Sequence, residues 1–214
     1  FNGEWEQRAF VKYPSVPTFS LADPEVKLLD LDGDGVTDVL RNGSRFEIFF
    51  NDRELGFHEL KVMPRGAIED FPEVSFSDPR VRIANLCGRL PTICIIYQGR
   101  IDYWPHFGRG KWGKRVTMKH SPRFPDRFNP AHVILGDLDG DGYDDVILVE
   151  HNQMTVWINQ SGNGFAEPFV VKGTPPMTDR DAVRIVDILG TGVPGILWSS
   201  SSSSSASARN RQML

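Results

Sequence analysis

A nine-residue stretch rich in aspartate and glycine occurs twice in this chain and constrains its fold more than any other feature. The first copy covers residues 30–38 (DLDGDGVTD), and the second covers residues 137–145 (DLDGDGYDD). Each copy has carboxylates at positions 1, 3, 5 and 9 and glycines at positions 4 and 6. Glycine permits the positive φ angles that fold so short a segment around an ion.

Clustered carboxylates of this kind suit a hard cation such as Ca²⁺, which takes about 6–8 oxygen ligands at roughly 2.3–2.6 Å. Without a cation, four carboxylates within nine residues repel one another. We therefore expect two calcium ions, each held by four aspartates and by the main-chain carbonyl of position 7. The predicted ligands are Asp30, Asp32, Asp34, Val36 and Asp38 in the first loop, and Asp137, Asp139, Asp141, Tyr143 and Asp145 in the second. Asp144 could replace Asp145 as the last ligand, but the spacing of the first copy favours Asp145.

The sequence around the two loops argues against an EF-hand. An EF-hand needs a bidentate Glu at position 12 and a helix on each side. Position 12 is Arg41 in one copy and Leu148 in the other. The flanking segments 26–29 and 146–149 are short and apolar, which is typical of strands. The loops are therefore predicted to lie within β-hairpins. The alternative interpretation is a turn that binds no metal, because Asp and Gly are ordinary turn residues.

The chain also repeats on a longer scale. Aromatic residues that closely follow a glycine recur at spacings of 52, 55 and 53 residues; they are Trp5, Phe57, Trp112 and Phe165. Each repeat contains four short strand-like segments, and no segment has the pattern of a long amphipathic helix. The strands beside the loops are apolar at successive positions, so both of their faces should be buried. An all-β fold is predicted, a partial β-propeller of ~53-residue four-stranded repeats. A β-sandwich explains this period less well.

The repeats divide the chain into two predicted parts. Residues 1–198 are expected to form about three full blades and part of a fourth, and the Ser-rich residues 199–214 a disordered tail. The loops at 85–92 and 187–195 lack most of the carboxylates. They are predicted to keep the backbone shape and to hold no ion. Closed propellers typically have four to eight blades, so the native protein is expected to continue with further blades.

Composition adds limits to this prediction. The chain has 24 basic and 28 acidic residues, for a net charge of −4. Eight of the acidic residues are predicted ligands, and two bound Ca²⁺ ions would bring the net charge to zero. No run of about 18 apolar residues occurs, so no membrane span is expected. The first residue is Phe and no signal peptide is visible, so we expect a fragment or a processed product.

The cysteines and histidines indicate neither a disulfide scaffold nor a catalytic site. Cys94 lies in an apolar run and is expected to be a buried thiol. A disulfide between Cys87 and Cys94 is the alternative hypothesis. The five histidines have no metal-ligand spacing, and no Gly-x-Ser-x-Gly motif occurs. An enzyme is therefore not expected. Residues 109–127 carry seven basic residues and one acidic residue, but the acidic chain (pI ≈ 5.7) argues against nucleic-acid binding.

The Asp-x-Asp-Gly-Asp-Gly-x-x-Asp loop resembles the FG-GAP/VCBS repeats of integrin-α-like propellers, whose metal ligands match the eight aspartates named above. Residues 70–81, 99–105, 114–125, 173–176 and 181–199 resemble the propeller of the B component of bacterial insecticidal toxin complexes. That family shares its N-terminal region with the Salmonella virulence plasmid protein SpvB. The resemblance spans roughly residues 20–200, and the sequence departs from the family pattern at 85–92 and after Ser199.

The resemblance implies a non-enzymatic structural and docking module. In that family the B and C components form a hollow shell around a toxic cargo, and the propeller closes one end and docks onto the pore-forming A component. The implied partners are further blades of the parent chain and toxin-complex components, in a secreted bacterial protein with Ca²⁺ as a rigidifying staple. An integrin-like adhesion or glycan- or protein-binding module is the alternative. Its candidate recognition residues are Trp104, His106, Phe107 and Trp112, for which packing between sheets is favoured.

Overall fold

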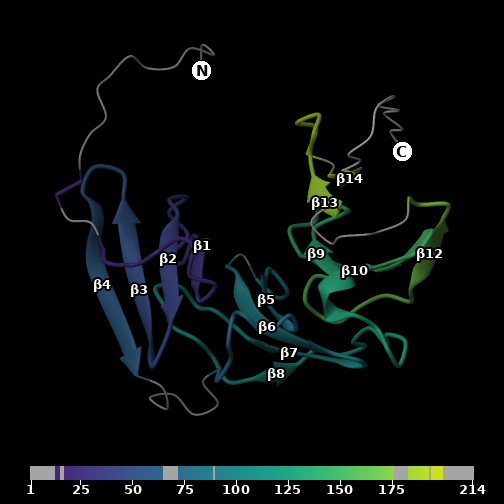
Figure 1. Cartoon of the computed structure of the whole chain (residues 1–214), viewed down its shortest axis with the longest axis horizontal. Coiled ribbons are helices and arrows are strands. Elements are labelled where there is room, and N and C mark those ends of the chain that lie inside the picture. Colours follow the sequence, from purple (N-terminus) through teal and green to yellow (C-terminus); the bar gives the residue numbers. More distant parts are fainter. Residues whose placement is uncertain are drawn as a thin grey trace.

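The computed structural model describes residues 13–14, 17–64, 72–88, 90–175, 183–192 and 194–199 and is built from antiparallel sheets. Three sheets have four strands, one has two, and in each sheet the strands follow chain order (Figure 1). The strands are β1 (Val26–Leu29), β2 (Asp38–Asn42), β3 (Arg45–Asp52), β4 (Gly56–Pro64), β5 (Val81–Ala84), β6 (Thr92–Tyr97), β7 (Arg100–Trp104), β8 (Val116–Thr117), β9 (Val133–Gly136), β10 (Asp145–Glu150), β11 (Gln153–Trp157), β12 (Phe169–Lys172), β13 (Val183–Val186) and β14 (Gly195–Trp198). Among the described residues the helical structure is the 3₁₀ turn η1 (Pro130–His132), which precedes β9.

The four sheets lie next to one another in an open arc. The first strands, β1, β5 and β9, lie toward the inside of the arc, and β4, β8 and β12 lie on the outside (Figure 1). This is the arrangement of propeller blades, and the described sheets do not close into a ring. The predicted all-β partial propeller is therefore confirmed, and the β-sandwich alternative is wrong.

Hydrophobic cores between adjacent blades hold the arc together. One core joins the first sheet to the second, for example through Ile48 and Ile93, and another joins the second to the third through Ile101 and Val146. Burial of one such side chain contributes about 1.5–3 kcal/mol. The second strands of the three full blades are buried at nearly every position. The prediction that strands beside the loops have both faces buried is therefore confirmed for these strands but is wrong for β1, where Leu28 is 56% exposed.

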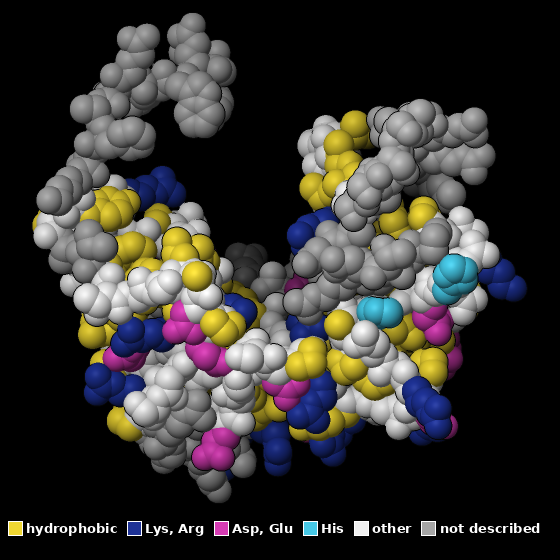
Figure 2. All heavy atoms as spheres, in the orientation of Figure 1, with side chains coloured by type: hydrophobic (Ala, Val, Ile, Leu, Met, Phe, Trp, Pro, Cys, Tyr) yellow, Lys and Arg dark blue, Asp and Glu magenta, His cyan; other side chains and the backbone are white. Residues whose placement is uncertain are grey.

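The β13–β14 pair ends the described series. One side of it packs against the third blade in a core that includes Ile147 and Val183. Leu197 and Val186 are 41% and 37% exposed. Hydrophobic side chains also reach the surface of the first sheet and of the β13–β14 pair in Figure 2. Inner propeller strands are normally covered on both sides, and among the described residues no further strand pairs with or packs on the outer side of β13–β14.

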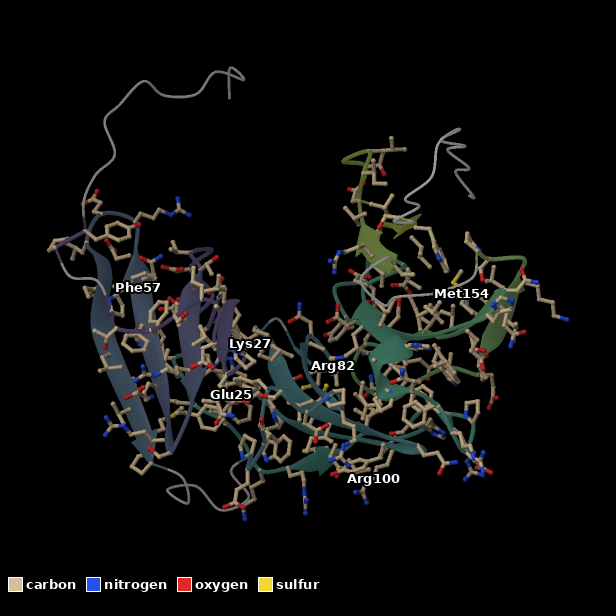
Figure 3. All side chains as sticks on the ribbon, viewed as in Figure 1. Glu25, Lys27, Phe57, Arg82, Arg100 and Met154 are labelled. Atoms are coloured by element: carbon tan, nitrogen blue, oxygen red, sulfur yellow. The ribbon has the colours of Figure 1, made fainter. Side chains whose placement is uncertain are left out.

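Glu25, at the start of β1, ties the connector between the first two blades to the first sheet (Figure 3). Its carboxylate accepts hydrogen bonds from Asn42 Nδ2 at 2.6 Å, from the main-chain N–H groups of Phe76 (2.9 Å) and Ser77 (3.0 Å), and from the hydroxyls of Ser75 and Ser77. Burial alone would raise the pKa of Glu25, but the hydrogen bonds from Ser75, Ser77 and Phe76 outweigh it and lower the pKa to about 2.

Several smaller expectations can be compared with the structure. Cys94 is fully buried, and both cysteines are free, so no Cys87–Cys94 bridge is present. Trp104, His106 and Trp112 are buried, whereas Phe107 is 69% exposed, so the packing interpretation is confirmed for three of the four candidate recognition residues. The repeat residue Trp5 and the tail residues 200–214 lie outside the described residues. No helix among the described residues is long and apolar enough to cross a membrane.

Candidate metal centres

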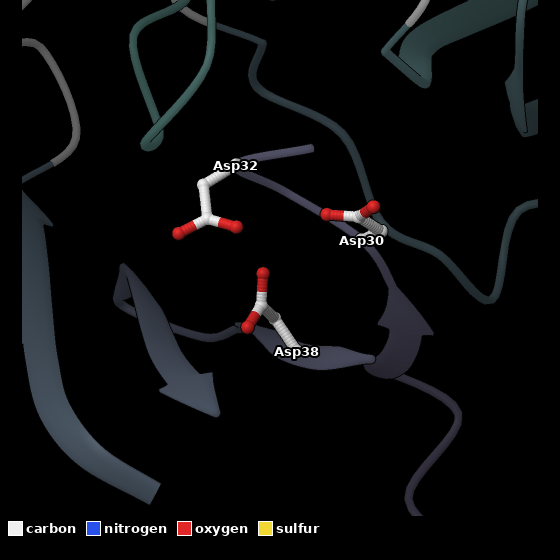
Figure 4. Close-up of side chains that lie close together, drawn as sticks. All are labelled: Asp30, Asp32 and Asp38. Atoms are coloured by element: carbon white, nitrogen blue, oxygen red, sulfur yellow. The ribbon is translucent and has the colours of Figure 1, made fainter. Parts of the chain in front are cut away.

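The two aspartate loops join the first and second strands of the first and third blades. In the first loop, one carboxylate oxygen from each of Asp30, Asp32 and Asp38 lies within 4.8 Å of the others. Figure 4 shows these three side chains directed toward a common centre. The second loop brings the corresponding residues together in the same way; they are Asp137, Asp139 and Asp145. Six of the eight predicted carboxylate ligands thus form two matching groups of three.

The first aspartate of each loop organises the turn. The two carboxylate oxygens of Asp30 accept hydrogen bonds from the main-chain N–H groups of Gly33 (2.7 Å) and Gly35 (2.9 Å). Asp137 binds the corresponding glycines at the same two distances. Gly33 and Gly35 have φ angles of +84° and +80°, which side chains with a Cβ rarely adopt. The glycines therefore allow the chain to wrap around the first carboxylate.

The ninth position is the buried anchor of each loop. Asp38 is fully buried and accepts hydrogen bonds from the N–H groups of Leu31 (2.9 Å) and Asn51 (2.8 Å). Asp145 is also fully buried and accepts the equivalent bonds from Leu138 (2.8 Å) and Asn159 (2.7 Å). Each anchor thereby connects its loop to the end of the third strand of the same blade.

Asn51 and Asn159 were missed in the sequence analysis. Each lies six residues before an aromatic anchor of the long repeat, Phe57 or Phe165, and the bridge Asn159↔Phe165 marks the same place in the fold. His106, six residues before Trp112, takes this position in the second blade, where the loop lacks the carboxylates. The signal that could have found the asparagines is their fixed distance from the aromatic anchors.

The remaining predicted ligands lie outside the two groups of three. Asp34 is exposed, and its carboxylate accepts a 2.7 Å hydrogen bond from the N–H group of Val36. Asp141 is likewise exposed and accepts a 2.9 Å bond from Tyr143. The structure therefore places positions 5 and 7 next to each other at the outer side of each loop. Their role as ligands stays a prediction.

Asp144 does not take part in the second group. Its carboxylate accepts a 2.7 Å hydrogen bond from the N–H group of Asn85, and its own N–H group donates to the carbonyl of Asn85 at 2.8 Å. These two bonds join the loop of the third blade to the loop of the second. Between Asp144 and Asp145, it is Asp145 that faces Asp137 and Asp139.

The loops of the second and fourth units carry other residues at most of the ligand positions of the aspartate loops. Thr92 stands where Asp38 and Asp145 stand, at the start of the second strand, and its hydroxyl donates a 2.7 Å hydrogen bond to the carbonyl of Ala84. Asp187 accepts bonds from the N–H groups of Thr191 (3.1 Å) and Gly192 (2.7 Å), so the fourth loop shares with the aspartate loops the bond from the residue five positions later. Among the described residues neither loop gathers three candidate ligands.

The chemistry of the two groups fits a calcium ion. Oδ1 of Asp32 is buried and has no hydrogen-bond partner among the described residues. A buried carboxylate oxygen without a donor destabilises the fold unless a cation lies beside it. Burial also raises the pKa of Asp38, and it raises the pKa of Asp145 to about 6, where the charges of Asp139 and Asp141 add to the effect of burial. A bound cation would offset both effects.

These observations define a class of protein, a series of β-propeller blades in which a short Asp/Gly loop joins the first two strands of a blade. Residues 137–198, which contain the loops of the third and fourth units, match the FG-GAP-like repeat. The predicted resemblance to FG-GAP-type propellers is therefore confirmed.

The similarity to solved structures is more particular. The Tc holotoxin pore of Photorhabdus luminescens matches 82% of this chain at 31% sequence identity, with a TM-score of 0.69. The TcdB2–TccC3 complex matches 71% of the chain at 27% identity, with a TM-score of 0.52. The predicted similarity to bacterial toxin complexes is thus confirmed.

A lectin of Agrocybe aegerita, described as recognising non-reducing terminal N-acetylglucosamine, shares the fold over 79% of this chain at 20% identity, with a TM-score of 0.58. The chain spans 8% of the matched holotoxin chain, 7% of the TcdB2–TccC3 chain and 44% of the lectin chain. No curated protein sequence matched the chain.

Proposed function

We propose that this chain forms part of the propeller of a secreted, Tc-toxin-like B component, and that it acts as a calcium-stapled structural and docking module without catalytic activity. The observation that carries the proposal is the pair of matching carboxylate groups in blades whose fold and sequence are similar to a Tc holotoxin over most of the chain. A propeller of this kind would contact further blades of its parent chain and other components of the toxin complex.

In this proposal Asp30, Asp32 and Asp38 hold one ion, and their counterparts in the third blade hold the other. Asp34 and the carbonyl of Val36 complete the first oxygen shell, as expected from the sequence. The ion supplies positive charge that offsets carboxylate repulsion. The buried aspartate at position 9 links the loop to the third strand through hydrogen bonds. A loop held in place by an ion would therefore also hold that strand in place. Metal binding of this kind is coupled to folding.

The adhesion or glycan-binding alternative has less support. Three of its four candidate recognition residues are buried, and Phe107 is the exposed one. A depression of about 620 Å³ does lie between the first two loops, lined by residues that include Asp30, Asp32, Asn85 and Leu90. Two of its lining residues, Asp30 and Asp32, belong to the first carboxylate group, so this depression overlaps the proposed metal site.

Calcium titration calorimetry on the EDTA-stripped chain tests the proposal, with the melting temperature followed in parallel. We expect two ions per chain and a rise in melting temperature. Asp32→Ala and Asp139→Ala should each remove one binding event and leave the other. Absence of calcium binding at millimolar concentration, a range in which extracellular calcium modules bind, would overturn the calcium assignment.

A further inference from the structure

Arg109 belongs to the second blade but lies against the first aspartate loop. It sits between β7 and β8, in the left-handed region with φ +47°, and is flanked by Gly108 and Gly110. Its N–H group donates a 3.0 Å hydrogen bond to the carbonyl of Leu31, and its own carbonyl accepts a 2.7 Å bond from Nζ of Lys61. The backbone of Arg109 is therefore fixed on the neighbouring blade.

The guanidinium group of Arg109 pairs with a predicted calcium ligand. Nη1 lies 3.3 Å from Oδ2 of Asp32, and Nη2 lies 2.5 Å from Oε2 of Glu59. The guanidinium also lies over the ring of Phe50, 4.8 Å from its centroid. The group is thus held from three sides. Asp32 therefore has one oxygen paired with a cation of the chain and the other buried without a partner.

The second aspartate loop has no such neighbour in the part of the chain that the structure describes. The carboxylates of loop 137–145 form no ion pair with a described lysine or arginine. In the third blade the position equivalent to Arg109, three residues after the bridge residue, is Gly162, which lies against the loop of the second blade and does not face loop 137–145. Among the described residues, the two aspartate loops therefore share their carboxylate pattern, and the ion pair with a basic side chain occurs at the first loop.

We propose that Arg109 is a resident cation of the first aspartate loop, which partly neutralises Asp32 when calcium is absent and makes calcium binding there weaker than at the second loop. The inference rests on the calcium binding proposed above. A calcium ion at the first loop must share Asp32 with the guanidinium and is repelled by it. At separations near 5 Å in a largely aqueous setting, this repulsion corresponds to about a ten-fold loss of affinity, and less at high salt.

Single-site backgrounds make the test direct. In the full chain, Asp139→Ala leaves the first loop as the binding site, and Asp32→Ala leaves the second. Calcium is titrated by calorimetry into the EDTA-stripped proteins at about 0.15 M ionic strength. On the Asp139→Ala background, Arg109→Gly should lower the Kd of the first loop about ten-fold. Glycine is chosen because it keeps the left-handed backbone of this position.

Three controls distinguish an effect of the Arg109 charge on calcium affinity from an effect of a changed structure. Arg109→Lys keeps the positive charge and should leave the Kd close to that of the parent background. Lys111→Gln removes an exposed charge from the same connecting segment and should have no effect. On the Asp32→Ala background, Arg109→Gly should not change the Kd of the second loop. Tryptophan fluorescence checks that each variant is folded.

Two results would overturn the inference, and they differ from each other. If both loops bind calcium with equal Kd and Arg109→Gly changes neither, Arg109 is only a structural contact and the proposed calcium function stands. If no variant, including the unmodified chain, binds calcium, the proposed function fails and this inference fails with it. A ten-fold gain confined to the first loop and reduced at high salt supports the resident cation.

Discussion

The main-chain N–H group of Asn159 donates a 2.7 Å hydrogen bond to Oδ1 of Asp145. The side chain of the same asparagine donates to the carbonyls of Leu86 and Asp144, each at 3.1 Å, and accepts from the N–H group of Gly162 at 2.9 Å. One buried residue thereby connects Asp145, the anchor of the second aspartate loop, to the loop of the second blade.

Replacement of Asn159 by alanine should destabilise the protein by about 2–3 kcal/mol, because it leaves buried carbonyls without donors. Urea unfolding at saturating calcium measures this loss. Asn163→Ala removes an exposed asparagine from the same turn and should change the stability by less than about 0.5 kcal/mol. Equal losses in the two variants would contradict the structural role of Asn159.

The hydrogen-bonded carboxylate of Glu25 should make stability fall in acid. Its pKa is lowered in the folded state to about 2, so the unfolded chain takes up a proton first as the pH falls below about 4.5. The contribution of Glu25 is therefore complete above that pH and is lost as the pH falls toward 2. Glu25→Gln should cost about 1–2 kcal/mol at pH 7, allowing for partial exposure, and the difference from the unmodified protein should narrow by pH 3. Urea unfolding at both pH values checks this, and Glu73→Gln, which changes an exposed glutamate in the same connector, is the control.

His106 should add a second acid-sensitive step at higher pH. Burial lowers its pKa to about 4, with a smaller contribution from the charge of Lys61. Because the unfolded histidine binds a proton below about pH 6.5, stability should fall by about 2 kcal/mol between pH 7 and pH 5. His106→Phe keeps an aromatic ring against Trp112, 4.2 Å away in the native stack, and should abolish this slope. The exposed His151 serves as the control, since His151→Gln should retain the slope in urea unfolding.

A side chain at Gly110 should destabilise the protein. Its φ angle is +65°, and a Cβ atom built there would lie 2.3 Å from Cδ1 of the fully buried Ile48. Gly110→Ala should cost about 2–4 kcal/mol, the sum of backbone strain and overpacking. Gly173 also has a positive φ (+81°) but no atom within 4 Å of the added Cβ, so Gly173→Ala should show the strain alone, about 1 kcal/mol. Thermal unfolding measures the stability of both variants. Equal losses of stability in Gly110→Ala and Gly173→Ala would contradict the predicted clash with Ile48.

Much of the fold follows from local sequence pattern. The spacing of the aromatic anchors and the two loops predicted the four-stranded blades, because each blade is a meander whose strands are neighbours in sequence. The grouping of Asp30, Asp32 and Asp38 also follows from spacing, since the glycine turns of the loop determine it. Their binding of calcium stays a prediction.

The contacts between blades could not be predicted in the same way. Arg109 reaches Asp32 across 77 positions of the chain, and no pattern around either residue indicates the other. The N–H group of Asn51 donates to Asp38 from the main chain, which almost any residue at position 51 could do. The identity of residue 51 therefore did not predict this contact. Asp34 and Asp141, at position 5 of the two loops, are both exposed and both accept a bond from the N–H group two residues later, which the ligand pattern of the motif did not predict.

The loops of successive blades rest on one another in a constant direction. Arg109 of the second blade donates to the carbonyl of Leu31 in the first, and Asn159 of the third donates to the carbonyl of Leu86 in the second. At both of these junctions the acceptor is the carbonyl of the second loop residue, whereas the donor is a main-chain N–H group in one and a side-chain amide in the other. The shared acceptor is a main-chain group that any residue provides, so the junction tolerates sequence change in the preceding loop.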